Sequence, residues 1–339
     1  MVSLIDVQSS NSRIASALPP RLVAVFVGAT SGVGEVSLKQ FAKHARQPRV
    51  YFVGRSQEAG DRIAAECKTL NSEGEYIFIK ADTSLIRTVD DICSDIKCKE
   101  KAVNLLFLST GSLVSAETSE GLNFVTALVT YSRNRFIVNL LPLLQQATAL
   151  RRVVTAFAAG KEGPVSINDF QGWKVSALSA RGHVSSLVTV SLEALAKKAP
   201  DVTFIHNFPG PLKSNLFRGG QGATIFVINI VFKAISPMMT WYSNQECGER
   251  HLFLATSARY PAASHGNITS GVPLSGEVAI ARGTNGESGS GVYSVDLAGE
   301  SSGPKVEELL TNFKKGGVGE KFWRHTEEEF ERITGRAAA

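Results

Sequence analysis

The sequence has few of the residues that mark secreted or metal-binding proteins. Only four of its 339 residues are cysteines, and none of them forms a Cys-x-x-Cys pair or has histidine partners at the spacing of a metal site. This usage argues against a disulfide framework, and no metal ligand set is expected. The chain is interpreted as a reduced, cytoplasmic protein.

Strong charge and long apolar runs are also missing. Basic residues exceed acidic ones by 36 to 31, without a dense basic run interleaved with aromatics, so no nucleic-acid partner is expected. The first 20 residues lack the basic start and apolar stretch of a signal peptide. The apolar stretch 223–242 is broken by Asn229, Lys233 and Pro237, too short for a predicted membrane span. It is interpreted as a helix that caps a substrate pocket, with a membrane-surface contact or a homo-oligomer contact as alternatives.

What the sequence does have is an apolar run at 22–27 that ends in a glycine turn and opens an amphipathic helix. A continuous apolar run is typical of a parallel strand that is buried on both faces. Gly28, Gly32 and Gly34 remove side chains where the backbone turns, approaches a pyrophosphate and packs the helix on the strand. A tight turn without a ligand is the alternative, but the flanking strand and helix favour nucleotide binding.

Further apolar strands alternate with helices along the chain. After the first they are predicted at 49–53, 75–80, 103–109, 152–157 and 202–207. This alternation predicts an α/β, doubly wound parallel sheet with a ligand crevice at the carboxyl ends of the strands. A long helix is expected at 123–146, a mobile Gly/Ser/Asn-rich insertion at 262–290 and two helices within 304–334.

Four motifs resemble those of short-chain dehydrogenases/reductases, above all of fungal members with long C-terminal extensions. They are the Gly-x-x-x-Gly-x-Gly turn, Asp82-Thr83, Ser109-Thr110-Gly111 and Pro209-Gly210. The resemblance implies a Rossmann-like sheet of about seven strands in the order 3-2-1-4-5-6-7, with the last strand at 291–297. It divides the chain into an N-terminal arm (1–20), a dinucleotide-binding core (21–214), a lid insertion (215–290) and a last strand with C-terminal helices (291–339).

The end of the second strand indicates the cofactor. In such folds an acidic residue there binds the adenosine ribose, whereas an arginine pairs with a 2′-phosphate. Arg55 therefore favours NADP(H), with a solvated surface arginine as the alternative. Asp82 and Thr83 match the family's adenine contact, with a helix N-cap as the alternative. The residues expected to contact NADP(H) are Gly28, Thr30, Ser31, Gly32, Val33, Gly34, Arg55, Asp82, Thr83, Thr110, Gly111, Pro209 and Gly210.

The family's catalytic Ser, Tyr, Lys and Asn have no counterparts at the matching positions. Phe157 or Ala158 stands at the serine, Val175 at the tyrosine and Ser179 at the lysine, and the asparagine position falls near Val129. The usual proton donor and the group that lowers its pKa are therefore expected to be absent.

Three polar residues are candidate replacements. Lys161 follows the fifth strand and is otherwise a solvated loop charge, and Asp169 could act as a base or cap a helix start. Ser179 is expected to contact the cofactor ribose. His183, one turn later, is interpreted as a packing histidine.

Two classes of function fit these observations. The first is an NADP(H)-dependent oxidoreductase with a rewired proton donor that acts on a bulky, apolar small molecule such as a fungal secondary metabolite; the resemblance supplies this substrate class. The second is a cyclase, isomerase, dehydratase or pseudoenzyme on the same fold, with NADP structural or absent.

Overall fold

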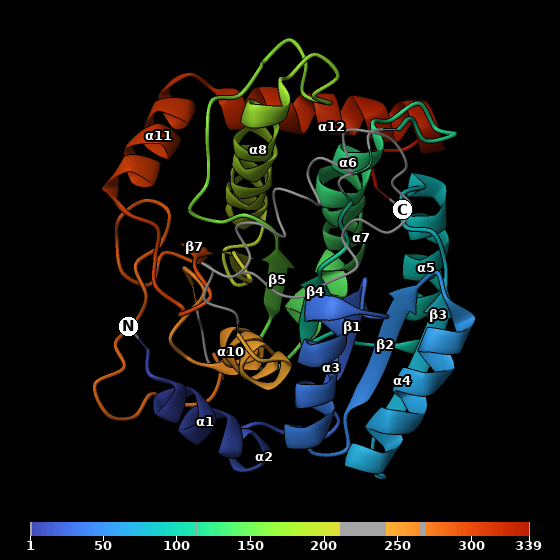
Figure 1. The fold of residues 1–339 in the computed structure, drawn as a ribbon, viewed down its shortest axis with the longest axis vertical. Coiled ribbons are helices and arrows are strands. Elements are labelled where there is room, and N and C mark those ends of the chain that lie inside the picture. Colours follow the sequence, from blue (N-terminus) through green and yellow to red (C-terminus); the bar gives the residue numbers. More distant parts are fainter. Residues whose placement is uncertain (1, 113, 115, 211–241, 265–268, 339) are drawn as a thin grey trace, which may run out of the picture.

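The computed structural model describes residues 2–112, 114, 116–210, 242–264 and 269–338. Its centre is one sheet of seven parallel strands in the order β3-β2-β1-β4-β5-β6-β7 (Figure 1). The strands are β1 (Val23–Val27), β2 (Arg49–Gly54), β3 (Glu75–Lys80), β4 (Leu105–Leu108), β5 (Arg152–Ala156), β6 (Thr203–Asn207) and β7 (Val292–Val295). The predicted fold class and strand order are confirmed.

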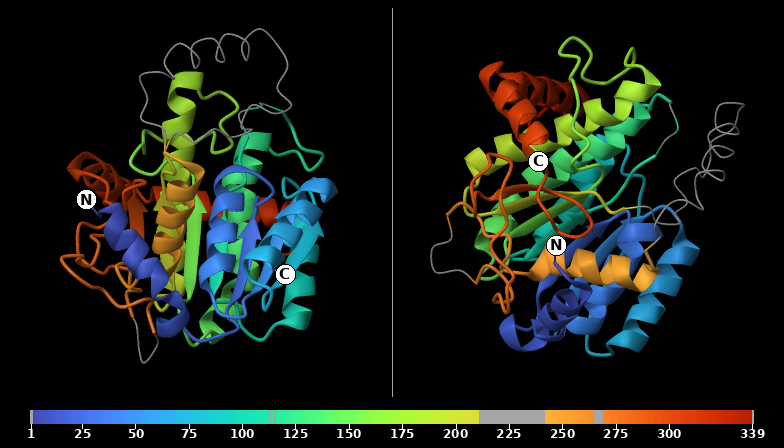
Figure 2. Two further views of the ribbon diagram at one scale, coloured as in Figure 1. Left: turned by 60° about the horizontal axis from the view of Figure 1, so that its bottom comes forward. Right: turned by 60° about the vertical axis from the view of Figure 1, so that its left-hand side comes forward.

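Helices cover both faces of the sheet, as the right-hand view of Figure 2 shows. One face carries α3 (Gly32–His44), α4 (Gln57–Leu70) and α10 (Asn244–Thr256), beside which lie the short α1 (Leu4–Ser12) and α2 (Ile14–Ala17). The other face carries α5 (Ile86–Lys99), α7 (Ser132–Gln146) and α8 (Ala177–Lys198). The C-terminal helices α11 (Pro304–Lys315) and α12 (Val318–Thr334) form a further layer outside α8.

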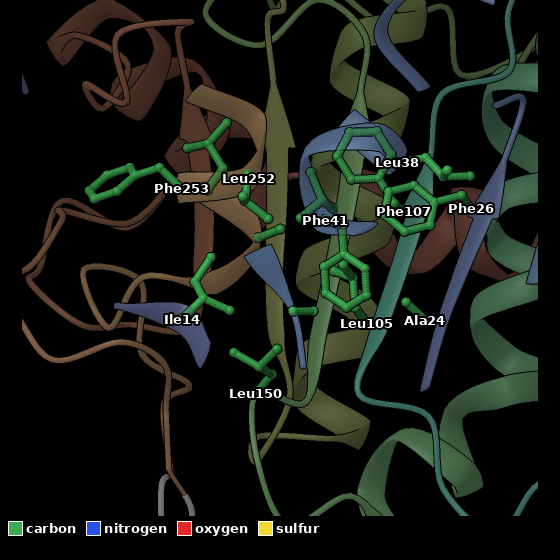
Figure 3. Close-up of a cluster of buried hydrophobic side chains, with 14 of the residues drawn as sticks. Ile14, Ala24, Phe26, Leu38, Phe41, Leu105, Phe107, Leu150, Leu252 and Phe253 are labelled. Carbon is green, nitrogen blue, oxygen red and sulfur yellow. The ribbon is translucent and has the colours of Figure 1, made fainter. Parts of the chain in front are cut away.

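The two cores follow from the period of two along each strand. In β1, Ala24 and Phe26 belong to the cluster beneath α3 and α10, whereas Val25 and Val27 belong to the cluster beneath α5, α7 and α8. Figure 3 shows Phe26 of β1 and Phe107 of β4 together, with ring centroids 5.3 Å apart, next to α3. The continuous apolar run in the sequence is thus a strand buried on both faces.

The predicted long helix is present but contains a π-helical turn. It consists of α6 (Phe124–Thr126), the π-helix η1 (Ala127–Tyr131) and α7, and Val129 lies in the π-helical turn. Such turns are frequent at functional sites. The carbonyl of Leu128 in this turn accepts a hydrogen bond from Thr110 Oγ1 (3.1 Å), which ties the turn to the end of β4.

The C-terminal layer is anchored by a buried ion pair. Arg135 of α7 donates to both carboxylate oxygens of Asp90 on α5 (2.5 and 2.6 Å). The same guanidinium donates to the carbonyls of Arg336 and Ala337, just beyond α12 (3.1 and 2.6 Å). Because Arg135 is fully buried, these bonds hold the end of the chain against α5 and α7.

The predicted lid insertion is described only in part. Residues 215–241 lie outside the described residues, and with them most of the stretch 223–242, so its proposed contacts stay predictions. Within the segment 262–290, which was predicted to be mobile, some described residues pack against the amino end of β5. Arg152 of β5 donates to the carbonyl of Ser270 (2.7 Å), and Val272 is fully buried. The mobility of this segment stays a prediction. Within the described ranges, no helix is long and apolar enough to cross a membrane.

Acid should destabilise this fold. Burial lowers the pKa of every described histidine, most clearly His251, whose pKa falls to about 4. Between about pH 6.5 and 4 the unfolded chain therefore binds protons that the folded chain does not bind, so the free energy of unfolding decreases as the pH falls. We expect His251 alone to contribute about 3 kcal/mol to this loss. Urea unfolding of the protein and of His251→Asn across this range checks it: the variant should lose less stability on acidification, and equal losses would contradict the assignment.

Candidate functional site

The glycine turn after β1 lies directly against the end of β4. Gly28 has φ +84°, and a Cβ on it would lie 2.7 Å from the amide nitrogen of Thr110. A Cβ on Gly34 would lie 2.5 Å from Ser109 Oγ and 2.6 Å from the carbonyl oxygen of Gly28. The protein's own packing therefore requires glycine at both positions, before any ligand is considered.

The N-terminus of α3 has the features of a phosphate site. Its N-cap, Ser31, makes no side-chain capping bond, and helix geometry leaves the first N–H groups, those of Gly32, Val33 and Gly34, without acceptors in the helix. The acidic residue of this first turn, Glu35, is paired with Lys39 (2.5 Å) and Arg62 (2.9 Å). Free N–H groups at the positive end of the helix dipole suit the pyrophosphate of a dinucleotide, so these residues fit that cofactor.

Two cations stand at the neighbouring end of β2. Arg55 follows Gly54 and is exposed, and Lys80, also exposed, is the register partner of Gly54 on β3. A Cβ on Gly54 would overlap the side chain of Thr30, so this face of the strand meets the glycine turn. Register partners in neighbouring strands share a face and lie roughly 5 Å apart, so the Lys80 side chain starts toward the same side. Neither cation has an ion pair within the described part of the chain.

Lys80 was missed by the sequence reasoning because its place depends on the β2–β3 register. The sequence around Lys80 suggests a different role, because Tyr76 and Lys80 have the Tyr-x-x-x-Lys spacing of the family's catalytic pair. Both lie on β3 at one edge of the sheet. The pair is thus separated by β2 and β1 from the strand ends at which the family's catalytic positions fall.

After β3, Asp82 does not cap α5. Its Oδ1 accepts a hydrogen bond from the amide of Ser84 (3.0 Å), and the N-cap of α5 is Leu85. The first N–H groups of α5, of Ile86 and Arg87, donate instead to the carboxylate of Glu120 (2.6 and 3.1 Å). The N-cap alternative for Asp82 and Thr83 is therefore wrong, and their adenine contact stays a prediction.

A buried arginine joins the ends of β4 and β5. Arg133 of α7 donates to the carbonyl of Thr110, to Thr155 Oγ1 and to the carbonyl of Ala156, the last over 3.1 Å. Burial lowers the pKa of Arg133 to about 9, and no described group accepts from its Nε. Sequence reasoning did not select this residue, although a charge within an apolar helical pattern was a visible signal. Arg133 therefore fixes the backbone just beyond the carboxyl ends of β4 and β5.

The family's serine position holds no hydroxyl group in this structure. Phe157 is partly exposed, and its ring stacks on His206 of β6 with centroids 6.4 Å apart. Ala158 is buried and donates its N–H to His206 Nε2 (3.2 Å), so the ring proton is assigned to Nδ1, which faces Thr189 Oγ1 (2.9 Å). Thr189 in turn donates to the buried carboxylate of Glu162 (2.8 Å). Ala158, His206, Thr189 and Glu162 thus form a buried polar network at the end of β5.

The three candidate catalytic residues lie in the loop after β5, in the connection before α8 and in the first turn of α8, and no hydrogen bond or ion pair among the described residues joins their side chains. Lys161 is exposed in the loop after β5, near the carboxyl end of the strand. Asp169 accepts the amide N–H groups of Trp173 (3.0 Å) and Lys174 (2.7 Å), which closes a turn in the connection to α8. It does not cap the start of α8, because that N-cap is Ser176. Ser179 is exposed in the first helical turn, where its amide and hydroxyl bond to Ser176.

The remaining predicted positions have clear locations. His183 is buried and bonded on both ring nitrogens, to the carbonyl of Phe170 (3.1 Å) and the amide of Ser166 (3.2 Å), which confirms a packing histidine. Pro209 and Gly210 follow β6, and Gly210 has φ +74°. A Cβ on Gly210 would lie 3.0 Å from Leu297 and 3.5 Å from Tyr242. Their cofactor contact, like that of Thr110 and Gly111, stays a prediction.

The relatives of this chain are oxidoreductases. No family model matches it. "Oxidoreductase AN1596" of Emericella nidulans is 37% identical over 334 residues, covering 96% of this chain and 97% of that protein. "Short-chain dehydrogenase/reductase SAT2" of Stachybotrys chartarum is 28% identical over 332 residues, covering 90% of each chain.

Solved structures give the same fold. The Pseudomonas aeruginosa RhlG/NADP active-site complex superposes with a TM-score of 0.56 at 21% identity, covering 78% of this chain and 98% of that chain. The L-sorbose reductase of Gluconobacter frateurii, complexed with NADPH and L-sorbose, superposes with a TM-score of 0.54 at 16% identity, covering 75% and 97%. With the sheet order, the glycine turn and the fungal relatives, these findings show that the chain belongs to the short-chain dehydrogenase/reductase superfamily.

Proposed function

We propose that the protein is an NADP(H)-dependent oxidoreductase with an atypical proton donor, acting on a bulky, apolar small molecule of fungal secondary metabolism. The observation that carries the proposal is the cofactor half of the site. The first N–H groups of α3 have no acceptor within the helix, and Arg55 and Lys80 lie at the ends of β2 and β3, where the proposal puts the adenosine ribose. Relatives named oxidoreductases support the reaction class, and structural neighbours whose titles name NADP or NADPH support the cofactor.

In this proposal the chain's residues divide into three roles. The N–H groups of Gly32, Val33 and Gly34 bind the pyrophosphate, and Arg55 and Lys80 bind the 2′-phosphate. When bound, NADP(H) supplies or accepts the hydride. Arg133 is a positioning residue, because it holds the Thr110 and Ala156 backbone at the strand ends. Lys161 is the candidate that delivers a proton from the loop after β5, by analogy of position alone.

Aromatic side chains support an apolar substrate. Phe157, Phe208 and Tyr242 are all partly exposed near the carboxyl ends of β5 and β6. Arg181 of α8 lies over the Phe208 ring, 5.6 Å from its centroid. Aromatic walls with few polar groups are typical of pockets for drug-sized molecules.

A non-redox enzyme is the second candidate, favoured by the absence of a hydroxyl group at the serine position. The two candidate functions are distinguished by incubating the purified protein with extract of the source organism, with and without NADPH. Consumption of NADPH together with one reduced product supports the oxidoreductase. Conversion of an extract component at equal rate without NADPH contradicts it and supports the alternative.

Cofactor preference should depend on both cations. We expect Arg55→Ala and Lys80→Ala each to weaken NADPH binding about tenfold or more, because each loses a charge-assisted bond to the phosphate, with NADH binding changed less than about twofold. Arg55→Asp should reverse the preference. Calorimetry measures the affinities of the unaltered protein and of each variant for NADPH and NADH, and Lys43→Ala, exposed at the far end of α3, is the matched control. Equal affinities of the unaltered protein for NADPH and NADH would remove the argument.

A further inference from the structure

A cavity lies between the connection that precedes α8 and helix α12. Its volume is about 430 Å³. The connection contributes Ile167, Phe170 and Trp173, and α12 contributes Lys321, Arg324 and His325. Figure 1 shows this connection beside α12 at the outer end of α8.

Helix α8 separates this cavity from the sheet. On one side of α8, Val184 and Val188 pack in the cluster that contains the strands, and Ser185 donates to the carbonyl of Ala158 (2.6 Å). On the other side, Leu187 packs in the cluster that contains Phe322 of α12. The cavity is therefore a different place from the strand ends at which a nicotinamide would lie.

One wall of the cavity is apolar and incompletely covered. Ile167 and Trp173 are each 47% exposed, which is unusual for large apolar side chains in this protein. Phe170 is fixed behind them by ring contacts to Phe322 (5.2 Å) and His325 (5.3 Å). The indole of Trp173 and the aliphatic side chain of Ile167 at the mouth of the cavity favour a flat apolar ligand.

The opposite wall offers hydrogen-bond donors and positive charge. Arg324 is exposed and forms no ion pair within the described ranges. His325 Nε2 lies 2.8 Å from the Tyr131 hydroxyl, and burial raises the pKa of Tyr131, so this hydroxyl stays protonated beside the imidazole ring. Of the acids in the lining, Asp169 already accepts two backbone N–H groups, and Glu328 lies one turn beyond Arg324 without an ion pair to it.

We propose that this cavity binds one planar aromatic molecule that carries a carboxylate or sulfonate group. The ring lies against Trp173 and Ile167, and the anionic group pairs with the Arg324 guanidinium, whose fork matches two acceptor oxygens. The volume falls within the range of small-molecule pockets and suits a molecule of two or three rings. This inference does not depend on the proposed oxidoreductase activity.

The test uses two probes that differ only in charge, anilinonaphthalene sulfonate and the uncharged phenylnaphthylamine. Fluorescence titrations are done with the full chain, with and without excess NADP⁺. We expect Arg324→Gln to weaken binding of the sulfonate about tenfold and to leave binding of the neutral probe unchanged. Trp173→Ala should weaken the binding of both probes.

The controls decide where the probe binds. Leu178→Ala removes another exposed apolar side chain, 98% exposed and absent from the cavity lining, and should change neither affinity. Because Trp173 and Arg324 are exposed, their variants should keep the fold, which circular dichroism checks. Equal affinity of the sulfonate for the protein and Arg324→Gln would overturn the proposal. Complete displacement of the sulfonate by NADP⁺ would also overturn it, since the probe would then occupy the dinucleotide crevice.

Discussion

Gly32→Asp is expected to abolish NADP(H) binding, whereas Gly32→Asn is expected to keep most of it. Gly32 has φ +60°, a conformation that asparagine and aspartate both tolerate better than other side chains. The two replacements have nearly the same shape, and they differ in charge and in the N–H donors of the asparagine amide. A carboxylate at the first turn of α3 would repel a bound pyrophosphate, and two like charges about 4 Å apart near a protein surface cost about 4 kcal/mol, or about a thousandfold in affinity.

Calorimetry with NADPH measures this difference, and the unfolding temperature without cofactor shows that both variants fold. Equal affinity of the two variants would mean that no phosphate approaches the helix N-terminus, and the glycine turn would then serve packing alone. Gly34 is unsuited to the test. Any side chain there meets the Gly28 carbonyl and Ser109, so a loss of binding could not be separated from a loss of folding.

The sheet was predictable because its signals are local. Each apolar run, such as 22–27, is continuous, and each ends in a glycine or a polar turn. The expected long helix also has a local signal, although its π-helical turn does not. Strand order was predicted from the family resemblance, and the observed order of the seven strands confirmed it.

The parts of the site that the sequence did not predict depend on long-range placement. Lys80 becomes a cofactor candidate only through its register with Gly54, and Arg133 only because its helix crosses the ends of β4 and β5. Asp169 is close to a site residue in the sequence but not in the structure. It is only eight residues after Lys161, but its turn places it against α12, on the outer side of α8. Closeness along the chain does not imply a shared site.

Reduction of simple ketones with NADPH should be slow, about 10²–10⁴-fold below that of relatives with an intact Ser-Tyr-Lys set, because the alignment puts Val175 in place of the family's tyrosine acid. Phe157 and Ala158 cannot donate to a carbonyl, and Val175 precedes α8 with no hydroxyl to offer. NADPH binding should remain measurable, so the defect lies in turnover. The absorbance of NADPH during incubation with simple ketones and quinones measures it. Brisk turnover by the unaltered protein would show that another donor already replaces the tyrosine.

The residual turnover, with ketones or with an active extract component, should depend on Lys161 and not on Asp169. Lys161→Met keeps the length of the side chain but removes its proton, so we expect at least a tenfold loss of turnover with NADPH affinity unchanged. Asp169→Asn is the matched control, because both oxygens of Asp169 accept backbone N–H groups and its turn lies beside α12. If Lys161→Met keeps full turnover, the lysine is a solvated loop charge and the proton comes from water or from the substrate itself. If Asp169→Asn also loses turnover with its fold intact, the connection before α8 must approach the strand ends when substrate binds, and the assignment of Asp169 to the outer side of α8 fails for the working enzyme.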